Sequence, residues 1–279
     1  QYGGCSSDRT DQVLAPFAEK NYQKHLREFG SVIDDPAKLE ALAVKQTKKD
    51  IYDALQTLEY QVNTLYSTQG QTPFVTVGFG LGTSWIEREI QKDILKIRIL
   101  GLGKERRTAI FPKLVFTLKR GLNLKPEDPN YDIKQLAIEC ATKRMYPDVV
   151  SYDTIKRLTG SFKAPMGCRS FLQGWTDPKT GKEVNAGRMN LGVITVNLPR
   201  IAMEANGDKA KFWKIFEERM RICKEGLLYK VERTKQATPE SAPILYKYGA
   251  FGHKLADTDS IDDLFKNGRA TVSLGYIGL

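Results

Sequence analysis

The chain is poor in the residues that build metal sites and disulfide frameworks. It has four cysteines and two histidines among 279 residues, and no two cysteines stand in C-x-x-C spacing. Neither histidine stands with a cysteine in a metal-ligand pattern. We therefore expect no metal site within this segment. Cys140 and Cys223 fall in predicted helices and read as small buried hydrophobes, whereas no function is attached to Cys5.

Long hydrophobic runs are missing as well. No run approaches the roughly 20 apolar residues that a membrane span needs. Residues 1–5 are polar and glycine-rich, unlike the apolar core of a signal peptide. These absences predict a cytoplasmic location, reduced thiols and no membrane partner.

Charge of one sign is not concentrated anywhere, although the net charge is +10. Lysine and arginine alternate with acidic residues along the chain, and no dense basic run or basic–aromatic motif occurs. We therefore expect no nucleic-acid partner. The first methionine is Met145, and residues 271–279 read as an apolar strand, so we expect the chain to be a piece of a longer protein.

Hydrophobic periodicity predicts helices and strands in alternation. Helices are predicted over residues 9–29, 37–66, 85–100 (capped by Ser84), 131–144, 199–204 and 209–233. Strands are predicted over residues 74–79, 108–118, 191–198, 243–248 and 270–277. This alternation predicts an α/β fold with mainly parallel strands. The strands are too few to close a barrel alone, so a partial barrel or an open sheet is expected.

One cysteine stands in a setting that differs from the others. Residues 160–175 read GSFKAPMGCRSFLQGW, with Cys168 directly after Gly167 and shortly after Pro165. Glycine permits a sharp turn and proline stiffens the approach to it. The residues alone leave two interpretations open, a presented catalytic or redox thiol and a buried structural thiol.

The sequence around this cysteine resembles that of a known family. Residues 162–172 (FKAPMGCRSFL), followed by residues 187–202 (GRMNLGVITVNLPRIA), are similar to the radical-cysteine segment of anaerobic, or class III, ribonucleotide reductases. Further stretches resemble the same family in the same order, namely residues 60–82, 111–122, 129–148 and 265–279. The resemblance thus covers nearly the whole chain.

The resemblance implies a fold and a reaction. Members of this glycyl radical group fold as a ten-stranded α/β barrel, and a finger loop, here around residues 160–190, places one cysteine at its centre. Cys168 holds that position. Its thiyl radical would take hydrogen from the ribose 3′ carbon, and the 2′ hydroxyl would leave as water. The chain is then a fragment of an enzyme that converts ribonucleoside triphosphates to deoxyribonucleotides, and the segment alone is expected to be inactive.

The resemblance also assigns an active-site asparagine. Asn190 matches it, and its amide can both donate to and accept from the ribose hydroxyls. The alternative is a turn-forming residue before a strand. Gly275 stands in a Gly-Tyr pair like that of the glycyl radical motif, but Arg269 is too far upstream, so we read Gly275 as a strand glycine near the substrate.

The family's cofactors are expected outside these residues. They comprise a C-terminal glycyl radical, a four-cysteine structural zinc site, and an activase that uses S-adenosylmethionine and an iron–sulfur cluster. A regulatory ATP-cone and the second active-site cysteine are expected before residue 1. No cofactor is expected within this segment.

Family members bind deoxynucleotide or ATP effectors between long helices at a dimer interface. Residues 1–70 match that helical region, and residues 71–279 match part of the barrel. Lys24 could meet an effector phosphate, and Glu59 could accept from a ribose or base. The alternative is a surface lysine and a glutamate that pairs two helices, because Glu59 lies in an apolar stretch. A homodimer is expected.

Two other functions stay open at the level of sequence. The chain could be a catalytically inactive nucleotide-binding or dimerisation module of the same family. It could also belong to another glycyl radical enzyme, such as a lyase. Those enzymes share the finger-loop cysteine but not the longer sequence that surrounds Cys168 here.

Overall fold

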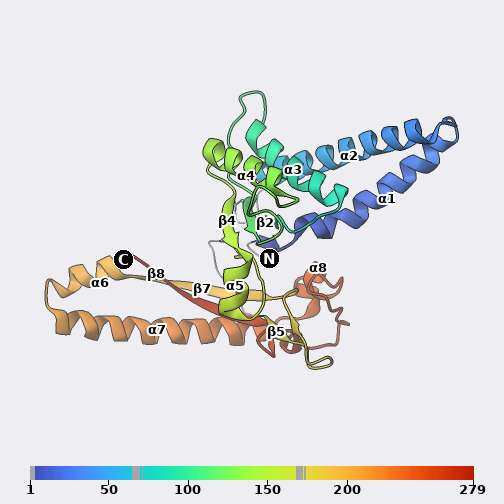
Figure 1. The fold of residues 1–279 in the computed structure, drawn as a ribbon. Coiled ribbons are helices and arrows are strands. Elements are labelled where there is room, and N and C mark those ends of the chain that lie inside the picture. The colour runs from blue at the N-terminus through green and yellow to red at the C-terminus, as the bar shows by residue number, and fades with distance from the viewer. Residues whose placement is uncertain (1–3, 65–69, 71, 168–171, 173) are drawn as a thin grey trace. The chain divides into compact units, whose positions relative to one another are not determined.

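A computed structural model describes residues 4–64, 70, 72–167, 172 and 174–279 (Figure 1). The chain forms two compact units, Gln1–Phe171 (unit 1) and Leu172–Leu279 (unit 2). Both units combine helices with parallel strands, which confirms the expected α/β class. The predicted division at residue 70 concerns function and stays a prediction.

Unit 1 contains a four-stranded sheet in which each strand is parallel to its neighbours. The strands follow one another across the sheet in chain order, namely β1 (Gly4–Ser7), β2 (Phe74–Phe79), β3 (Lys113–Leu118) and β4 (Asp148–Ser151). Thr76 lies in the middle of β2 and pairs with Ser6 on one side and Lys113 on the other.

Helices cover one face of this sheet. They are α1 (Thr10–Gly30), α2 (Pro36–Thr64), α3 (Trp85–Leu100) and α4 (Tyr131–Arg144). The short helix α5 (Tyr152–Thr159) follows β4 and contributes no residue to their core. Alternate residues of β2 and β3, such as Phe79 and Phe116, pack against Ile90 and its neighbours in one apolar core. The first two helices form a hairpin, seen in blue in Figure 1.

Unit 2 is built around two long parallel strands joined by helices. Its elements are β5 (Trp175–Thr176), β6 (Glu183–Val184), β7 (Met189–Asn197), α6 (Leu198–Ala205), α7 (Lys209–Lys235), η1 (Pro239–Ser241), α8 (Pro243–Tyr246), η2 (Ile261–Phe265) and β8 (Ala270–Ile277). Strands β7 and β8 pair along their length, and β5 and β6 form a small antiparallel hairpin. A second apolar core surrounds Met189 and Ile261.

Helix α7 packs closely on β7. A Cβ atom at Gly226 would lie 3.0 Å from the Cδ1 atom of Ile194, and one at Gly192 would lie 2.8 Å from the Cδ atom of Lys230. The Nζ atom of Lys230 also donates to the Val193 carbonyl at 3.2 Å. Gly192 and Ile194 therefore face α7. Because side chains alternate along a strand, Val193 and Thr195 lie on the opposite face of β7.

Most predicted elements are confirmed, and two are corrected. The strand predicted over residues 243–248 is wrong: Pro243 begins the helical turn α8, and Tyr246 is buried within it. The strand predicted over residues 108–118 is right only from Lys113 onward. The predicted cap of α3 is confirmed as a capping box between Ser84 and Glu87.

None of the helices in the described part of the chain is long and apolar enough to cross a membrane. Among residues 4–64, 70, 72–167, 172 and 174–279, no three His, Cys, Asp or Glu side chains are grouped so that they could hold a metal ion.

Candidate active site

The approach to the predicted finger loop is anchored on the sheet of unit 1. The Gly167 N–H donates to the Oγ1 atom of Thr76 at 3.2 Å, and Thr76 is only 2% exposed. Gly167 has φ +55°, a left-handed conformation that glycine adopts without strain. Cys168 itself lies outside the described residues, so its place beyond this anchor stays a prediction.

The chain reaches Gly167 through a buried segment. Phe162 and Ala164 are buried, and the Phe162 ring stacks on Tyr152 with centroids 4.8 Å apart. Since both the segment and its last residue are held, the loop begins from a fixed point on the sheet.

The anchored face of that sheet is rich in hydroxyl groups. Ser6, Thr76 and Thr117 all lie on the side opposite the helices, because the helix-facing residues of β2 and β3 are the alternate ones. Within the described part of the chain, the buried Ser6 Oγ and Thr117 Oγ1 atoms have no hydrogen-bond partner. Buried hydroxyls without partners are costly, so these two atoms are unusual features of this face.

A β-bulge sets the direction of Asn190 in unit 2. The register of β7 with β8 passes from Asn190 opposite Thr271 directly to Gly192 opposite Val272, so Leu191 is an extra residue. The bulge puts Asn190 on the face of Thr271 and Ser273, away from α7. Without the bulge, the alternation of side chains would give Asn190 the same face as Gly192.

Both ends of the Asn190 amide are hydrogen-bonded. Its Nδ2 atom donates to the Oγ atom of Ser273 at 2.6 Å, and its Oδ1 atom accepts from the Gly192 N–H at 3.0 Å. A backbone N–H can only donate, so the oxygen must be the end that faces Gly192. One N–H and one lone pair of the amide remain for a ligand.

The segment before β7 is held by Arg269. This arginine is 6% exposed, its Nε atom donates to the Gly187 carbonyl at 2.8 Å, and its guanidinium lies 4.9 Å from the centroid of the Trp175 ring. Gly187 has φ +70°, and a Cβ atom there would lie 2.4 Å from the Phe251 carbonyl oxygen. Only glycine fits, so the entry to β7 is fixed three residues before Asn190.

The two predicted effector residues are not brought together. Lys24 has a 58% exposed side chain, 3.7 Å from Glu28. His25 contacts Asp50 at 2.7 Å, and Glu59 follows nine residues later on α2, which at 1.5 Å per residue is about 13 Å along the helix. Their roles in effector binding stay predictions.

Glu59 takes part in a buried ion pair that the sequence did not reveal. Its Oε1 atom accepts from the Nε atom of Arg98 at 2.8 Å, and Arg98 is fully buried. Arg98 also donates from Nη2 to the Pro112 carbonyl at 2.6 Å. Burial raises the pKa of the Glu59 carboxyl, and Arg98 opposes that rise. This geometry matches the alternative in which Glu59 pairs two helices, here α2 and α3.

The N–H groups of the glycine-rich turn after β2 are bound by a carboxylate of the chain itself. The Oδ2 atom of the buried Asp11 accepts from the N–H groups of Gly80, Leu81 and Gly82 at 3.1, 3.1 and 2.8 Å. Burial raises the pKa of Asp11, and these hydrogen bonds oppose the rise. Because a carboxylate of the chain occupies these donors, the turn is not a free phosphate-binding loop.

Sequence reasoning missed Asp11, Arg98 and Ser273. Arg98 had a visible signal, since it interrupts the apolar run Ile94–Leu95–Ile97–Ile99 of a predicted helix. Ser273 had one too, because polar and apolar residues alternate through Thr271–Leu274 and so give β8 one polar face. Asp11 had none, because an acidic residue in a first helical turn is common.

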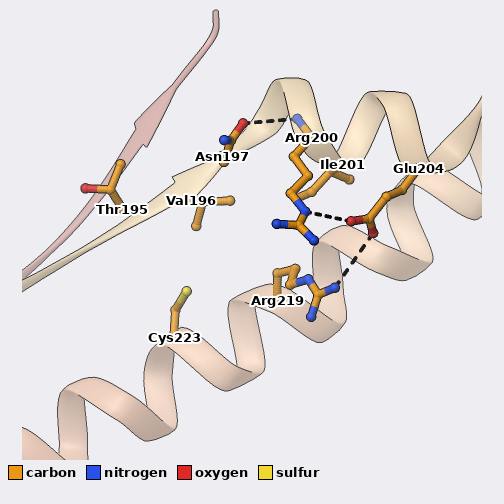
Figure 2. Close-up of a pocket in the computed structure, with 8 residues that line it drawn as sticks. All are labelled: Thr195, Val196, Asn197, Arg200, Ile201, Glu204, Arg219 and Cys223. Atoms are coloured by element: carbon orange, nitrogen blue, oxygen red, sulfur yellow. Dashed lines mark hydrogen bonds and ion pairs between the residues drawn. The ribbon is translucent and has the colours of Figure 1, made fainter.

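A hollow of about 290 Å³ lies on the other side of β7, where α6 and α7 meet the strand (Figure 2). Glu204 stands between two arginines, 2.9 Å from the Nε atom of Arg200 and 3.7 Å from an Nη atom of Arg219. Val196 and Cys223 contribute apolar lining. Since Glu204 already pairs with both arginines and Val196 faces α7, the hollow is separate from the face that carries Asn190.

Parallel sheets with helices on one face and hydroxyl groups on the other define a mixed α/β protein. The family model described as anaerobic ribonucleoside-triphosphate reductase matches residues 1–279, and the chain belongs to this family. Proteins of that name from Escherichia coli (strain K12) and Enterobacteria phage T4 are 54% and 52% identical over the whole chain. The chain spans 39% of the bacterial relative's length and 47% of the phage relative's.

Proposed function

We propose that this chain forms part of the catalytic barrel of an anaerobic ribonucleoside-triphosphate reductase, an oxidoreductase that makes deoxyribonucleotides by thiyl radical chemistry. The observation that carries the proposal is the doubly anchored Asn190 on a polar strand face, in a chain matched by this family from end to end. The substrate would be a ribonucleoside triphosphate, as the name of the relatives says.

Strand order supports a barrel. In unit 1 the parallel strands follow chain order and the helices cover one face, whereas doubly wound sheets carry helices on both faces and reverse their strand order. In such a barrel, the interior face of the unit 1 sheet would be the one that carries Ser6, Thr76 and Thr117. Ten strands in the closed barrel, and α1 and α2 at a homodimer interface, belong to this proposal.

Cys168 and Asn190 would divide the chemistry. A glycyl radical outside these residues would supply the oxidising equivalent, by taking the hydrogen atom of the Cys168 thiol. The sulfur would then take a hydrogen atom from the ribose 3′ carbon, and the 2′ hydroxyl would take up a proton and leave as water. The reductant, formate or a dithiol protein, would supply the two electrons, and the Cys168 thiol would return its hydrogen atom to the 3′ carbon. The free N–H of Asn190 donates to one ribose hydroxyl and its free lone pair accepts from the other, which holds the sugar in place for that transfer.

The remaining parts of the enzyme belong to the same proposal. The radical glycine, a structural zinc site, formate or a dithiol protein as reductant, and an iron–sulfur activase would come from outside residues 1–279. Deoxynucleotide or ATP effectors would bind at the helical hairpin, where the exposed Lys24 can reach a phosphate. Glu59 would act there through its ion pair with Arg98, by fixing α2 against α3.

Substitution of Cys168 tests the central claim. In the full-length protein, Cys168→Ser should still form the glycyl radical, seen by electron paramagnetic resonance, but make no deoxyribonucleotide. The matched control is Cys223→Ser, since Cys223 is a partly buried cysteine on the α7 side of β7 and should keep turnover. Reduction by the Cys168→Ser enzyme in an anaerobic assay would overturn the assignment.

A second candidate is a nucleotide-binding and dimerisation module without catalysis. The α1–α2 hairpin favours it, because the hairpin leaves Val13, Phe17 and Tyr60 more than half exposed, at 56%, 64% and 57%. Calorimetry with dATP, dGTP and dTTP, together with sedimentation, should then show effector-dependent dimers. Absence of both binding and association would exclude this candidate.

A further inference from the structure

We propose that Ser273 is a positioning residue that fixes the amide of Asn190 for the ribose. The proposal rests on the proposed function, in which Asn190 holds the ribose hydroxyls. Ser273 lies on β8, 83 residues along the chain from Asn190, and its Oγ atom accepts from the Asn190 Nδ2 atom at 2.6 Å. No family wording singled out this serine.

The geometry gives the serine a defined task. An asparagine side chain can rotate about its last torsion and exchange its oxygen and nitrogen, which differ in hydrogen-bonding role. The Gly192 N–H holds the oxygen end at 3.0 Å, and Ser273 holds the nitrogen end. With both ends tied, the free N–H and the free lone pair each keep one direction.

The bulge at Leu191 makes this contact possible. Ser273 stands opposite Val193, and the extra residue moves Asn190 onto the same face as Ser273 and Thr271. Thr271 is the nearest rival for the role, but its hydroxyl is engaged with the Met189 carbonyl at 3.3 Å. Ser273 is therefore the hydroxyl that the structure assigns to Asn190.

Positioning has a kinetic consequence that a purely structural serine would lack. A small displacement of a group that orients substrate can lower the rate by about 100-fold. We expect Ser273→Ala in the activated full-length enzyme to lower kcat by about 10- to 100-fold, at an unchanged yield of glycyl radical. Ser241→Ala, the same change at an exposed serine of unit 2, should leave kcat as in the wild type.

A threonine variant and a valine variant of Ser273 keep the test decisive if the alanine variant does not fold normally. Threonine and valine have nearly the same shape and both suit a strand, but only threonine has the hydroxyl. Ser273→Thr should keep kcat within about threefold of the wild type, whereas Ser273→Val should fall with Ser273→Ala. Equal kcat for the threonine and valine variants would overturn the proposal.

A double-mutant cycle shows whether Ser273 acts through Asn190. The readout is the dissociation constant of CTP, ATP, GTP or UTP, whichever the wild type binds most tightly, measured on the unactivated full-length enzyme. Ser273→Ala should weaken binding in the wild type and add nothing in an Asn190→Ala background. If the two losses add, Ser273 acts independently and the inference is wrong. If Asn190→Ala keeps both affinity and turnover, the role of Asn190 in the proposed function fails instead.

Discussion

The two units place parallel strands beside helices, but they bury those helices to very different extents. Eight of the sixteen residues of α3 in unit 1 are buried, whereas Leu227 is the single buried residue among the twenty-seven of α7 in unit 2. Trp213 and Tyr229 on α7 are 58% and 71% exposed. The core of unit 1 therefore buries its helices, whereas the long helix α7 of unit 2 is held by a few close contacts with β7.

Charge is distributed in the same contrasting way. Unit 1 buries Asp11, Glu59 and Arg98: Glu59 pairs with Arg98, and Asp11 accepts from backbone N–H groups. Unit 2 buries Arg269 against the Gly187 carbonyl, but its carboxylate–arginine pair of Glu204 and Arg200 lies on a partly exposed surface. Substitutions of the buried charges Glu59 and Arg98 in unit 1 should accordingly act on folding, whereas those around Asn190 in unit 2 should act on turnover.

The largest effect should come from Arg98→Met. It leaves the Glu59 carboxylate buried without its partner, which should cost about 3–5 kcal/mol of unfolding free energy in denaturant titrations. Arg107→Met is the control, because Arg107 and Glu105 form a pair with 78% and 71% exposed side chains and should change stability by less than about 0.5 kcal/mol. Adding Glu59→Met to Arg98→Met should recover most of the loss. Similar losses for Arg98→Met and Arg107→Met would remove the contrast between buried and exposed charge.

The next largest difference between the two units should be in the unfolding free energy lost when an isoleucine is truncated to alanine. Ile90 on α3 is 1% exposed, so Ile90→Ala should lower the unfolding free energy by about 3 kcal/mol. Ile222 on α7 is 44% exposed, so Ile222→Ala should cost less than about 1 kcal/mol. Denaturant titration followed by circular dichroism measures both. A loss of about 3 kcal/mol at Ile222 would show that α7 is buried in solution.

The fold was predictable wherever local signals agree with packing. Helix α3 has a capping serine, Ser84, and a sustained apolar period, and its bounds are as predicted. Residues 243–248 gave a strand-like apolar run, but Pro243 suits a first helical turn and the core takes up Tyr246. Strands of four residues, such as β1 and β4, carry too little pattern and are defined by the neighbours with which they pair.

The sequence alone supplies candidates for one part of the site, and their roles stay predictions. Asn190 and Cys168 came from the family wording, which carries chemistry in a short stretch of chain. The partner of Asn190 did not, because Ser273 is 83 residues away and a bulge decides which face Asn190 shares with it. Arg98 and Glu59 each interrupt an apolar stretch, but they are separated by 39 residues, so the sequence does not show that they pair with each other.

The pH dependence of stability should have opposite signs at Glu59 in unit 1 and at Glu204 in unit 2. Burial raises the pKa of Glu59, so its stabilising contribution is present below the ordinary glutamate pKa of about 4.3 and is lost as the pH rises through the raised value. The hydrogen bond from Arg200 lowers the pKa of Glu204, so its contribution is present above the ordinary value and is lost as the pH falls through the lowered value. Melting temperatures from about pH 3 to pH 8 should show the wild type gaining on Glu59→Gln toward acid pH and losing on Glu204→Gln. The same sign for both variants would contradict the difference in burial.

The smallest effect should distinguish how the two units end their helices. Met145 ends α4 with φ +61° and Asn206 ends α6 with φ +50°, both in the left-handed region. A methionine there is strained by roughly 1 kcal/mol, whereas asparagine tolerates the conformation. Relief of this strain in Met145→Gly should raise the unfolding free energy by about 0.5–1 kcal/mol. The greater conformational entropy of glycine in the unfolded chain should cancel part of that gain.

Asn206→Gly should gain no more than a few tenths of a kcal/mol, because little strain is present to relieve. Met145→Ala is the control for side-chain size, since alanine removes the 88% exposed side chain but keeps the Cβ atom that causes the strain. Thermal unfolding of the three variants separates these effects. If Met145→Ala stabilises the protein as much as Met145→Gly does, then exposure of the methionine side chain, and not the backbone conformation, is what weakens the end of α4.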